Sequence, residues 1–116
     1  MSRMDRVNQM IKREISTLIQ EELQDPSIGF VTITKVTVTR DLKIARVNFS
    51  VLGTQEDIRK ALDALNRSRG YLRKLIAERI SIRYIPELEF YYDDSLAYEA
   101  RLEKTFEDIR KIQRNE

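Results

Sequence analysis

Apolar residues recur at steps of three and four along the first part of the chain and predict a helix over Ser2–Leu23. They are Met4, Val7, Ile11, Ile15, Leu18, Ile19 and Leu23. Ser2 with Asp5 three residues later resembles a capping box, and Asp25 before Pro26 is typical of a helix end. The apolar stripe predicts that one face of this helix packs on a core.

Two alternating segments that are dense in β-branched residues predict strands over Phe30–Thr39 and Ala45–Val51. Between Ile33 and Val36 the apolar phase slips, which indicates either a β-bulge or a strand that is partly covered on both faces. Only a short polar segment separates the two strands. We therefore expect a hairpin.

The next helix is predicted to begin after Thr54, because Asp57 follows at the spacing of an N-terminal cap. Its apolar stripe is interrupted at Asn66–Gly70, which holds poor helix formers and a glycine, and the stripe resumes at Leu72. The pattern therefore predicts a helix, a kink and a second helix.

Strand chemistry returns over Ile80–Tyr92, although Pro86 within this segment argues for an edge position, a bulge or a break. The aromatic rings of four tyrosines could stack on bases, but their alternation with apolar residues leads us to expect that they pack in the core: Tyr84, Tyr91, Tyr92 and Tyr98. Asp94 or Ser95 can then cap a last helix. The apolar stripe of that helix is Tyr98, Leu102, Phe106 and Ile109.

The predicted order is helix, strand, strand, helix, kink, helix, strand, helix. This order indicates an α+β fold with a three-stranded sheet packed on helices. A length of 116 residues suits a single domain over 1–116, with a disordered tail after about residue 112. The first six elements match the order of the prokaryotic, type II form of the KH domain, which is an RNA-binding fold.

Composition narrows the possible chemistry. The chain has no cysteine and no histidine, so it lacks thiolate nucleophiles and the commonest general base and imidazole metal ligand. The common nucleotide-binding, zinc and nucleophile-elbow motifs do not occur. We therefore predict no catalytic residue, no metal site and no cofactor. No window nears the ~20 apolar residues that cross a bilayer, which predicts a cytoplasmic protein with no membrane partner. We also expect no small-molecule substrate.

Positive charge is concentrated around the predicted kink. From Asn66 to Arg83 six basic residues are opposed by one glutamate, which gives +5, whereas the whole chain carries +2. Basic side chains beside a helix start attract phosphate, and a glycine lets a sugar-phosphate backbone approach closely. The alternative is a solvated helix face in which the glycine only relieves a crowded helix crossing. The candidate RNA-binding residues are Arg67, Arg69, Gly70, Arg73 and Lys74.

A secondary RNA-binding surface is predicted on the first helix, where Arg6 and Arg13 share the polar side with Gln9. Asp5 and Glu14 dilute the positive charge of this helix. For these two arginines a solvated helix face is the favoured interpretation.

Several segments, taken together and in order, resemble the ribosome-binding factor A (RbfA) family over nearly the whole chain. The resemblance implies a type II KH-like fold in which a kink of a small residue, any residue and glycine replaces the GXXG loop. The matching kink positions are Ser68, Arg69 and Gly70, so Ser68 joins the candidate site; serine departs from the usual alanine but is also small. The segments are Asp5-Arg6-Val7, Asp25-Pro26, Ile28 to Thr34, Asp41-Leu42 with Ala45 and Val47, Leu52-Gly53, and Pro86 to Phe90 with Tyr92 to Ser95.

This resemblance also implies a function. RbfA proteins are non-enzymatic factors that bind the immature 30S ribosomal subunit and assist late 16S rRNA maturation, including 5′-end processing and growth in the cold. The implied partners are the 30S subunit with its 16S rRNA and a ribosome-associated GTPase that promotes release, and we expect a monomer. Two alternatives stay open: a KH-like single-stranded RNA-binding module acting outside the ribosome, and a protein-interaction domain whose basic face meets an acidic partner.

Overall fold

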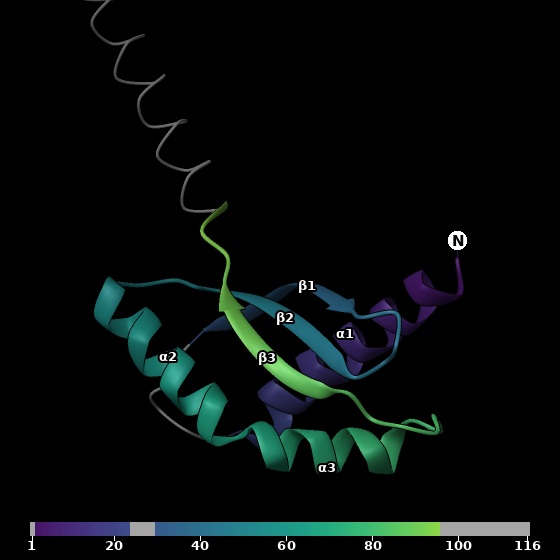
Figure 1. Cartoon of the computed structure of the whole chain (residues 1–116). Helices are drawn as coiled ribbons and strands as arrows, with labels where there is room; N and C mark the ends of the chain where they lie inside the picture. The colour runs from purple at the N-terminus through teal and green to yellow at the C-terminus, as the bar shows by residue number, and fades with distance from the viewer. Residues whose placement is uncertain (1, 24–29, 96–116) are drawn as a thin grey trace, which may run out of the picture.

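The structure is a computed structural model and describes residues 2–23 and 30–95 (Figure 1). Their order is the predicted α+β order, and the break between the two consecutive helices falls at Ser68. The expected last helix, with its stripe from Tyr98 to Ile109, and the expected tail lie outside the described residues. The described elements are α1 (Arg3–Glu22), β1 (Val31–Val38), β2 (Ile44–Val51), α2 (Gln55–Arg67), α3 (Arg69–Arg79) and β3 (Glu87–Tyr92).

Helix α1 begins at the predicted capping box. The Ser2 hydroxyl accepts from the Asp5 N–H at 3.1 Å, and the Asp5 carboxylate accepts from the Ser2 N–H at 3.1 Å. Such reciprocal bonds satisfy donors that the first helical turn leaves open. The stop expected at Asp25-Pro26 lies outside the described residues. The buried face of α1 follows the predicted stripe: Ile11, Ile15, Leu18 and Ile19.

The sheet has the strand order β1-β2-β3, with β2 antiparallel to β1 and parallel to β3. The predicted phase slip is a β-bulge, because the pairing register shifts between Ile33 and Lys35 and leaves Thr34 as the extra residue. The Thr34 hydroxyl donates to Asp93 Oδ2 at 2.6 Å, and this bond lowers the pKa of the Asp93 carboxyl below its ordinary value. The bulge is thereby attached to the residue that follows β3.

The prediction of a strand over Ile80–Tyr92 was wrong in its first half, since β3 spans only Glu87–Tyr92. Pro86 is buried directly before the strand and has no N–H to donate to a sheet. Ile80 instead closes α3, because its N–H donates to the Ile76 carbonyl at 2.9 Å. The apolar residues between Ile80 and Pro86 therefore pack against the core without joining the sheet.

One face of the sheet carries the core. Along β2, Ala45, Val47 and Phe49 each have an exposed fraction of 0%, and they form one cluster with the buried faces of the three helices. Among the described residues the alternating positions face away from this core. They present a mixed set of exposed side chains: Thr32, Lys35, Thr37, Arg46 and Tyr91.

Of the four tyrosines expected in the core, Tyr98 lies outside the described residues, and among the other three the expectation holds for Tyr92 alone. Tyr92 packs against the core and meets Phe49 edge-on, with ring centroids 6.0 Å apart. The prediction was wrong for Tyr84, which is 63% exposed, and for Tyr91, which is 47% exposed. Tyr84 precedes β3, and Tyr91 occupies a strand position that faces away from the core.

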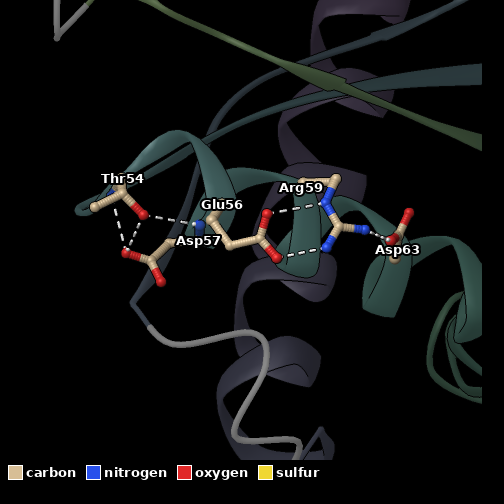
Figure 2. Close-up of polar contacts among 5 residues, drawn as sticks. All are labelled: Thr54, Glu56, Asp57, Arg59 and Asp63. Carbon is tan, nitrogen blue, oxygen red and sulfur yellow. Dashed lines mark hydrogen bonds and ion pairs between the residues drawn. The ribbon is translucent and has the colours of Figure 1, made fainter.

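Helix α2 begins at a second capping box, formed by the predicted Thr54 and Asp57 (Figure 2). The Asp57 carboxylate accepts from the Thr54 N–H at 2.8 Å, and the Asp57 N–H donates to Thr54 Oγ1 at 3.2 Å. The bond from the Thr54 N–H lowers the pKa of Asp57 below its ordinary value. Gly53 is required beside this box, because a Cβ at that position would collide with the Asp57 side chain.

We expect Gly53→Ala to lower the free energy of unfolding by about 1 kcal/mol, a typical effect of losing an N-cap. The added methyl group would push the Asp57 side chain away from Thr54. Urea unfolding followed by circular dichroism measures this loss. Gly70→Ala is the matched control, because a Cβ there meets nothing within 4 Å. Equal losses at the two glycines would contradict the role assigned to Gly53.

Candidate nucleic-acid interface

Helices α2 and α3 meet at a single residue rather than at a loop. Ser68, with φ −93° and ψ 0°, is both the C-cap of α2 and the N-cap of α3. Its N–H donates to the Ala64 carbonyl at 3.1 Å, and its carbonyl accepts from the Leu72 N–H at 2.9 Å. Backbone hydrogen bonds thus continue through the bend and hold the two helices together. The predicted kink at Ser68 is confirmed.

Gly70 leaves an open patch of backbone in the first turn of α3. The residue is exposed, and a Cβ built on it would meet no described atom within 4 Å. The alternative that Gly70 relieves a crowded helix crossing is therefore wrong. The missing side chain leaves the backbone of this turn accessible, and close approach of a sugar-phosphate backbone to it stays a prediction.

Cations lie on both sides of this patch. Arg67 is exposed in the last turn of α2, and Lys74 follows Gly70 by four residues, which places the two on one face of α3. Arg69 Nε donates to the Asn66 carbonyl at 3.4 Å, which is a long bond. Lys74 forms no ion pair with any described residue. We call Arg67, Ser68, Arg69, Gly70 and Lys74 the kink surface.

Arg73, the remaining candidate, is engaged within the fold. Its Nε and Nη2 donate to the Ile85 carbonyl at 3.2 and 2.8 Å, and its Nη1 lies 3.4 Å from Glu87 Oε1. These contacts tie α3 to the segment that leads into β3. Arg73 therefore positions the start of the strand, and phosphate binding by its guanidinium stays a prediction.

Two other arginines of the basic stretch lie away from the kink surface. Arg83 places its guanidinium over the Tyr84 ring, 5.4 Å from the ring centroid. Arg79 joins α3 to α1 through ion pairs of 3.7 to 3.9 Å. Of the basic residues counted between Asn66 and Arg83, some therefore make contacts within the fold, and the others belong to the kink surface. The partners of Arg79 are Glu14, Glu21 and Glu22.

Arg59 of α2 pairs with two acidic residues of the same helix, Glu56 and Asp63 (Figure 2). The Arg59 guanidinium donates to both carboxylate oxygens of Glu56 and, at 3.3 Å, to Asp63 Oδ2. The hydrogen bond from Arg59 lowers the pKa of Glu56 below its ordinary value. Asp63 is the last acidic residue of α2 before the bend.

The secondary candidates Arg6 and Arg13 line one shallow hollow on α1, together with Gln9, Met10 and Glu14. Neither guanidinium is joined by an ion pair or a hydrogen bond to another residue in the described ranges. The Glu14 carboxylate lies 3.8 Å from Arg79 Nη1. Of the two carboxylates expected to dilute the charge of these arginines, that of Glu14 is therefore shared with α3.

Sequence reasoning missed the groove between α1 and the free edge of β1, which Lys12 and Lys35 line. The alternation of the strand was used to find the core, and its exposed face was not considered. One signal was available, since Lys35 is the only charged residue between Phe30 and Thr39. The contact with Lys12 depends on how α1 packs against the sheet and has no local signal.

The groups that the kink surface offers are guanidinium, ammonium and accessible backbone, which suit phosphate. Over residues 2–23 and 30–95, no three acidic side chains gather closely enough to hold a metal ion. No helix in the same ranges has the length and the apolar character needed to cross a membrane.

Helices α2 and α3 meet at the small residue Ser68, two positions before Gly70, and helices cover one face of the sheet. The chain is therefore a KH-like domain without a GXXG loop. It belongs to the ribosome-binding factor A family, whose sequence model matches residues 3–106.

Individual relatives agree with this assignment. Ribosome-binding factor A of Macrococcus caseolyticus is 38% identical over 109 residues, which is 94% of this chain and 96% of that protein. The crystal structure of ribosome-binding factor A from Thermus thermophilus has a TM-score of 0.71 at 26% identity, over 78% of this chain and 97% of that chain. A homology model of the Thermus thermophilus factor, fitted into the cryo-EM map of a 30S–RbfA complex, has a TM-score of 0.64 at 29% identity, over 75% and 91% of the two chains.

Proposed function

We propose that this protein binds the immature 30S ribosomal subunit and assists late maturation of 16S rRNA, including processing of its 5′ end, with its greatest importance during growth in the cold. Family membership and the likeness to the factor fitted into a 30S complex support this proposal. The observation that carries it is the kink surface, where Arg69, Lys74 and the open backbone at Gly70 lie together. The protein acts by binding and catalyses no step.

The kink surface contributes to RNA binding in two ways, through its positive charge and through its shape. Its cations bind phosphates of any sequence and release counterions, which supplies affinity. The fixed bend between α2 and α3 supplies shape, because only some arrangements of rRNA bring phosphates to it. Binding therefore shifts the rRNA toward the arrangement that fits.

A factor of this kind must leave when maturation is complete. We propose a ribosome-associated GTPase as the partner that promotes release. We further propose that the protein works in the cytoplasm as a monomer, so that one copy occupies one subunit.

Sedimentation of a cell lysate through a sucrose gradient tests this function. We expect the protein in the 30S fractions, and more of it in cells grown in the cold. A protein that stays at the top of the gradient, or that travels with 70S ribosomes, would contradict the proposal. A KH-like module acting outside the ribosome would instead bind short free oligonucleotides better than purified 30S subunits. A protein-interaction domain would keep its partner after nuclease treatment.

Gly70→Ala is expected to weaken binding to purified 30S subunits by roughly tenfold, which corresponds to about 1.4 kcal/mol. The methyl group would stand between the backbone of α3 and the phosphate. The fold should keep its stability, because the site is open and alanine is the better helix former. Fluorescence anisotropy with a labelled protein measures the affinity. Ser81→Ala, at an exposed position beyond the end of α3, is the control and should bind like the unchanged protein; equal affinity for all three would argue against close approach at Gly70.

A further inference from the structure

A groove of about 220 Å³ lies between the N-terminal half of α1 and the free edge of β1. Asn8, Gln9 and Lys12 line it from α1, and Lys35 and Val36 line it from β1. We propose that this α1–β1 groove binds a phosphate of the RNA backbone, on a segment other than the one at the kink surface. The inference rests on the proposed function, since it takes RNA to be the ligand.

The free edge of β1 supplies a backbone donor. The Thr39 N–H donates to the Ile44 carbonyl of β2 at 2.9 Å. In an antiparallel pair, every second residue bonds to the neighbouring strand, and the residues between them point their N–H groups away from it. Val36 and Val38 are such intervening residues, so their N–H groups point away from β2. The Val38 N–H donates to Asn8 Oδ1 at 2.9 Å. The Val36 N–H has no such partner among the described residues. It is one donor that a phosphate oxygen in the groove can satisfy.

The charge around the groove is positive. Lys12 and Lys35 bear ammonium groups that form no ion pair with a carboxylate in the described ranges, and the charge of Lys35 helps to lower the pKa of Asp93 below its ordinary value. Asp5 also lines the groove, but its carboxylate already accepts from the Ser2 N–H in the capping box, at 3.1 Å. Two ammonium groups and an outward N–H form the set of donors that proteins use for phosphate.

The hollow lined by Arg6 and Arg13 continues this positive surface. Gln9 lines both the hollow and the groove, so the two are neighbours across one turn of α1. The carboxylate of the hollow, that of Glu14, is shared with Arg79. A strand of RNA lying across Gln9 would therefore meet cations on both sides of it.

The groove and the kink surface lie at different ends of the molecule. In Figure 1 the N-terminal end of α1 lies at the right of the view, whereas the junction of α2 and α3 lies at the lower left. One backbone segment at each site would make the domain a clamp on two parts of a folded RNA. Once the first site is occupied, the second binds at a high effective concentration, which favours RNAs that present both segments at the right separation.

The test compares the full-length protein with the Lys12→Gln/Lys35→Gln double variant, using purified 30S subunits and protein-free 16S rRNA as separate ligands. We expect the double variant to bind both ligands roughly tenfold more weakly at 0.1 M salt, with a salt slope lower by about 1.4 to 1.8. Lys43→Gln/Lys60→Gln removes the same charge from exposed positions elsewhere and should cost far less. Lys12→Arg/Lys35→Arg should restore the slope. If the glutamine pair unfolds, Lys35→Gln alone, at an exposed position, carries the test with a slope change of about 0.7 to 0.9.

Each outcome separates the groove from the function on which it rests. A double variant that binds both ligands like the unchanged protein overturns the groove and leaves the proposed function standing. Weaker binding to 30S subunits with unchanged binding to 16S rRNA also overturns it, because the groove would then meet a ribosomal protein. If the unchanged protein binds rRNA through these lysines but does not bind 30S subunits, the groove stands and the proposed function fails.

Discussion

Phe49→Ala is expected to lower the free energy of unfolding by roughly 3–5 kcal/mol, the range for removing a buried aromatic ring. The ring has an exposed fraction of 0% in the central strand β2, and it meets Tyr92 with centroids 6.0 Å apart. Its removal leaves a cavity where both sheet neighbours and the helices converge. Because small domains have a total stability of only about 5–15 kcal/mol, this one change removes a large part of it. Urea unfolding measures the loss through the midpoint and the slope.

Tyr84→Ala is the control for Phe49→Ala. Its ring is 63% exposed and its described contact is with the Arg83 guanidinium, so we expect a loss within about 1 kcal/mol. Similar losses at Phe49 and Tyr84 would mean that the core is not where the structure places it.

The second large effect is expected at the kink surface, in binding rather than in stability. Arg69→Glu combined with Lys74→Glu should weaken binding to 30S subunits on the order of 30- to 100-fold at 0.1 M salt, because each lost phosphate contact removes about 0.7 to 0.9 from the slope of affinity against salt. Repulsion between the new carboxylates and the phosphates adds to this loss. Both residues are exposed on α3, so the unfolding midpoint should change little.

Lys43→Glu combined with Lys60→Glu is the matched control for this pair. It makes the same change in net charge at exposed positions on the hairpin turn and on α2. We expect a small loss of affinity from the long-range field alone. If both pairs weakened binding equally, the contact would be a diffuse attraction and the kink surface would have no special part in it.

Much of the fold was predictable because its signals are local. The stripe of α1 and the two capping boxes depend on residues at most a few positions apart, and the kink followed from the interruption at Asn66–Gly70. The bulge at Thr34 was visible as a phase slip. Its partner Asp93, 59 residues away, was not, since only the folded sheet brings the two together.

The site was predictable in part for the same reason. Gly70 and the neighbouring cations are consecutive in the sequence, and the structure places them at the bend. The true partners of Arg73 and Arg79 are carbonyl and carboxylate groups that reach them through tertiary packing. A sequence window counts such arginines as free charge. The groove beside Lys35 was missed because Lys12 and Lys35 lie far apart in the sequence and meet only when α1 packs on the edge of β1.

The most direct test of the central claim uses the absence of cysteine from the chain, because a single introduced thiol gives a unique attachment point. An iron chelate on Ser68→Cys generates hydroxyl radicals at the bend, and primer extension along 16S rRNA then reports which nucleotides are cut. We expect strong local cleavage of 16S rRNA in 30S complexes from position 68, and weak cleavage from a chelate on Glu56→Cys, at the other end of α2. No cleavage from position 68, or equal cleavage from both positions, would contradict an rRNA interface at the kink surface.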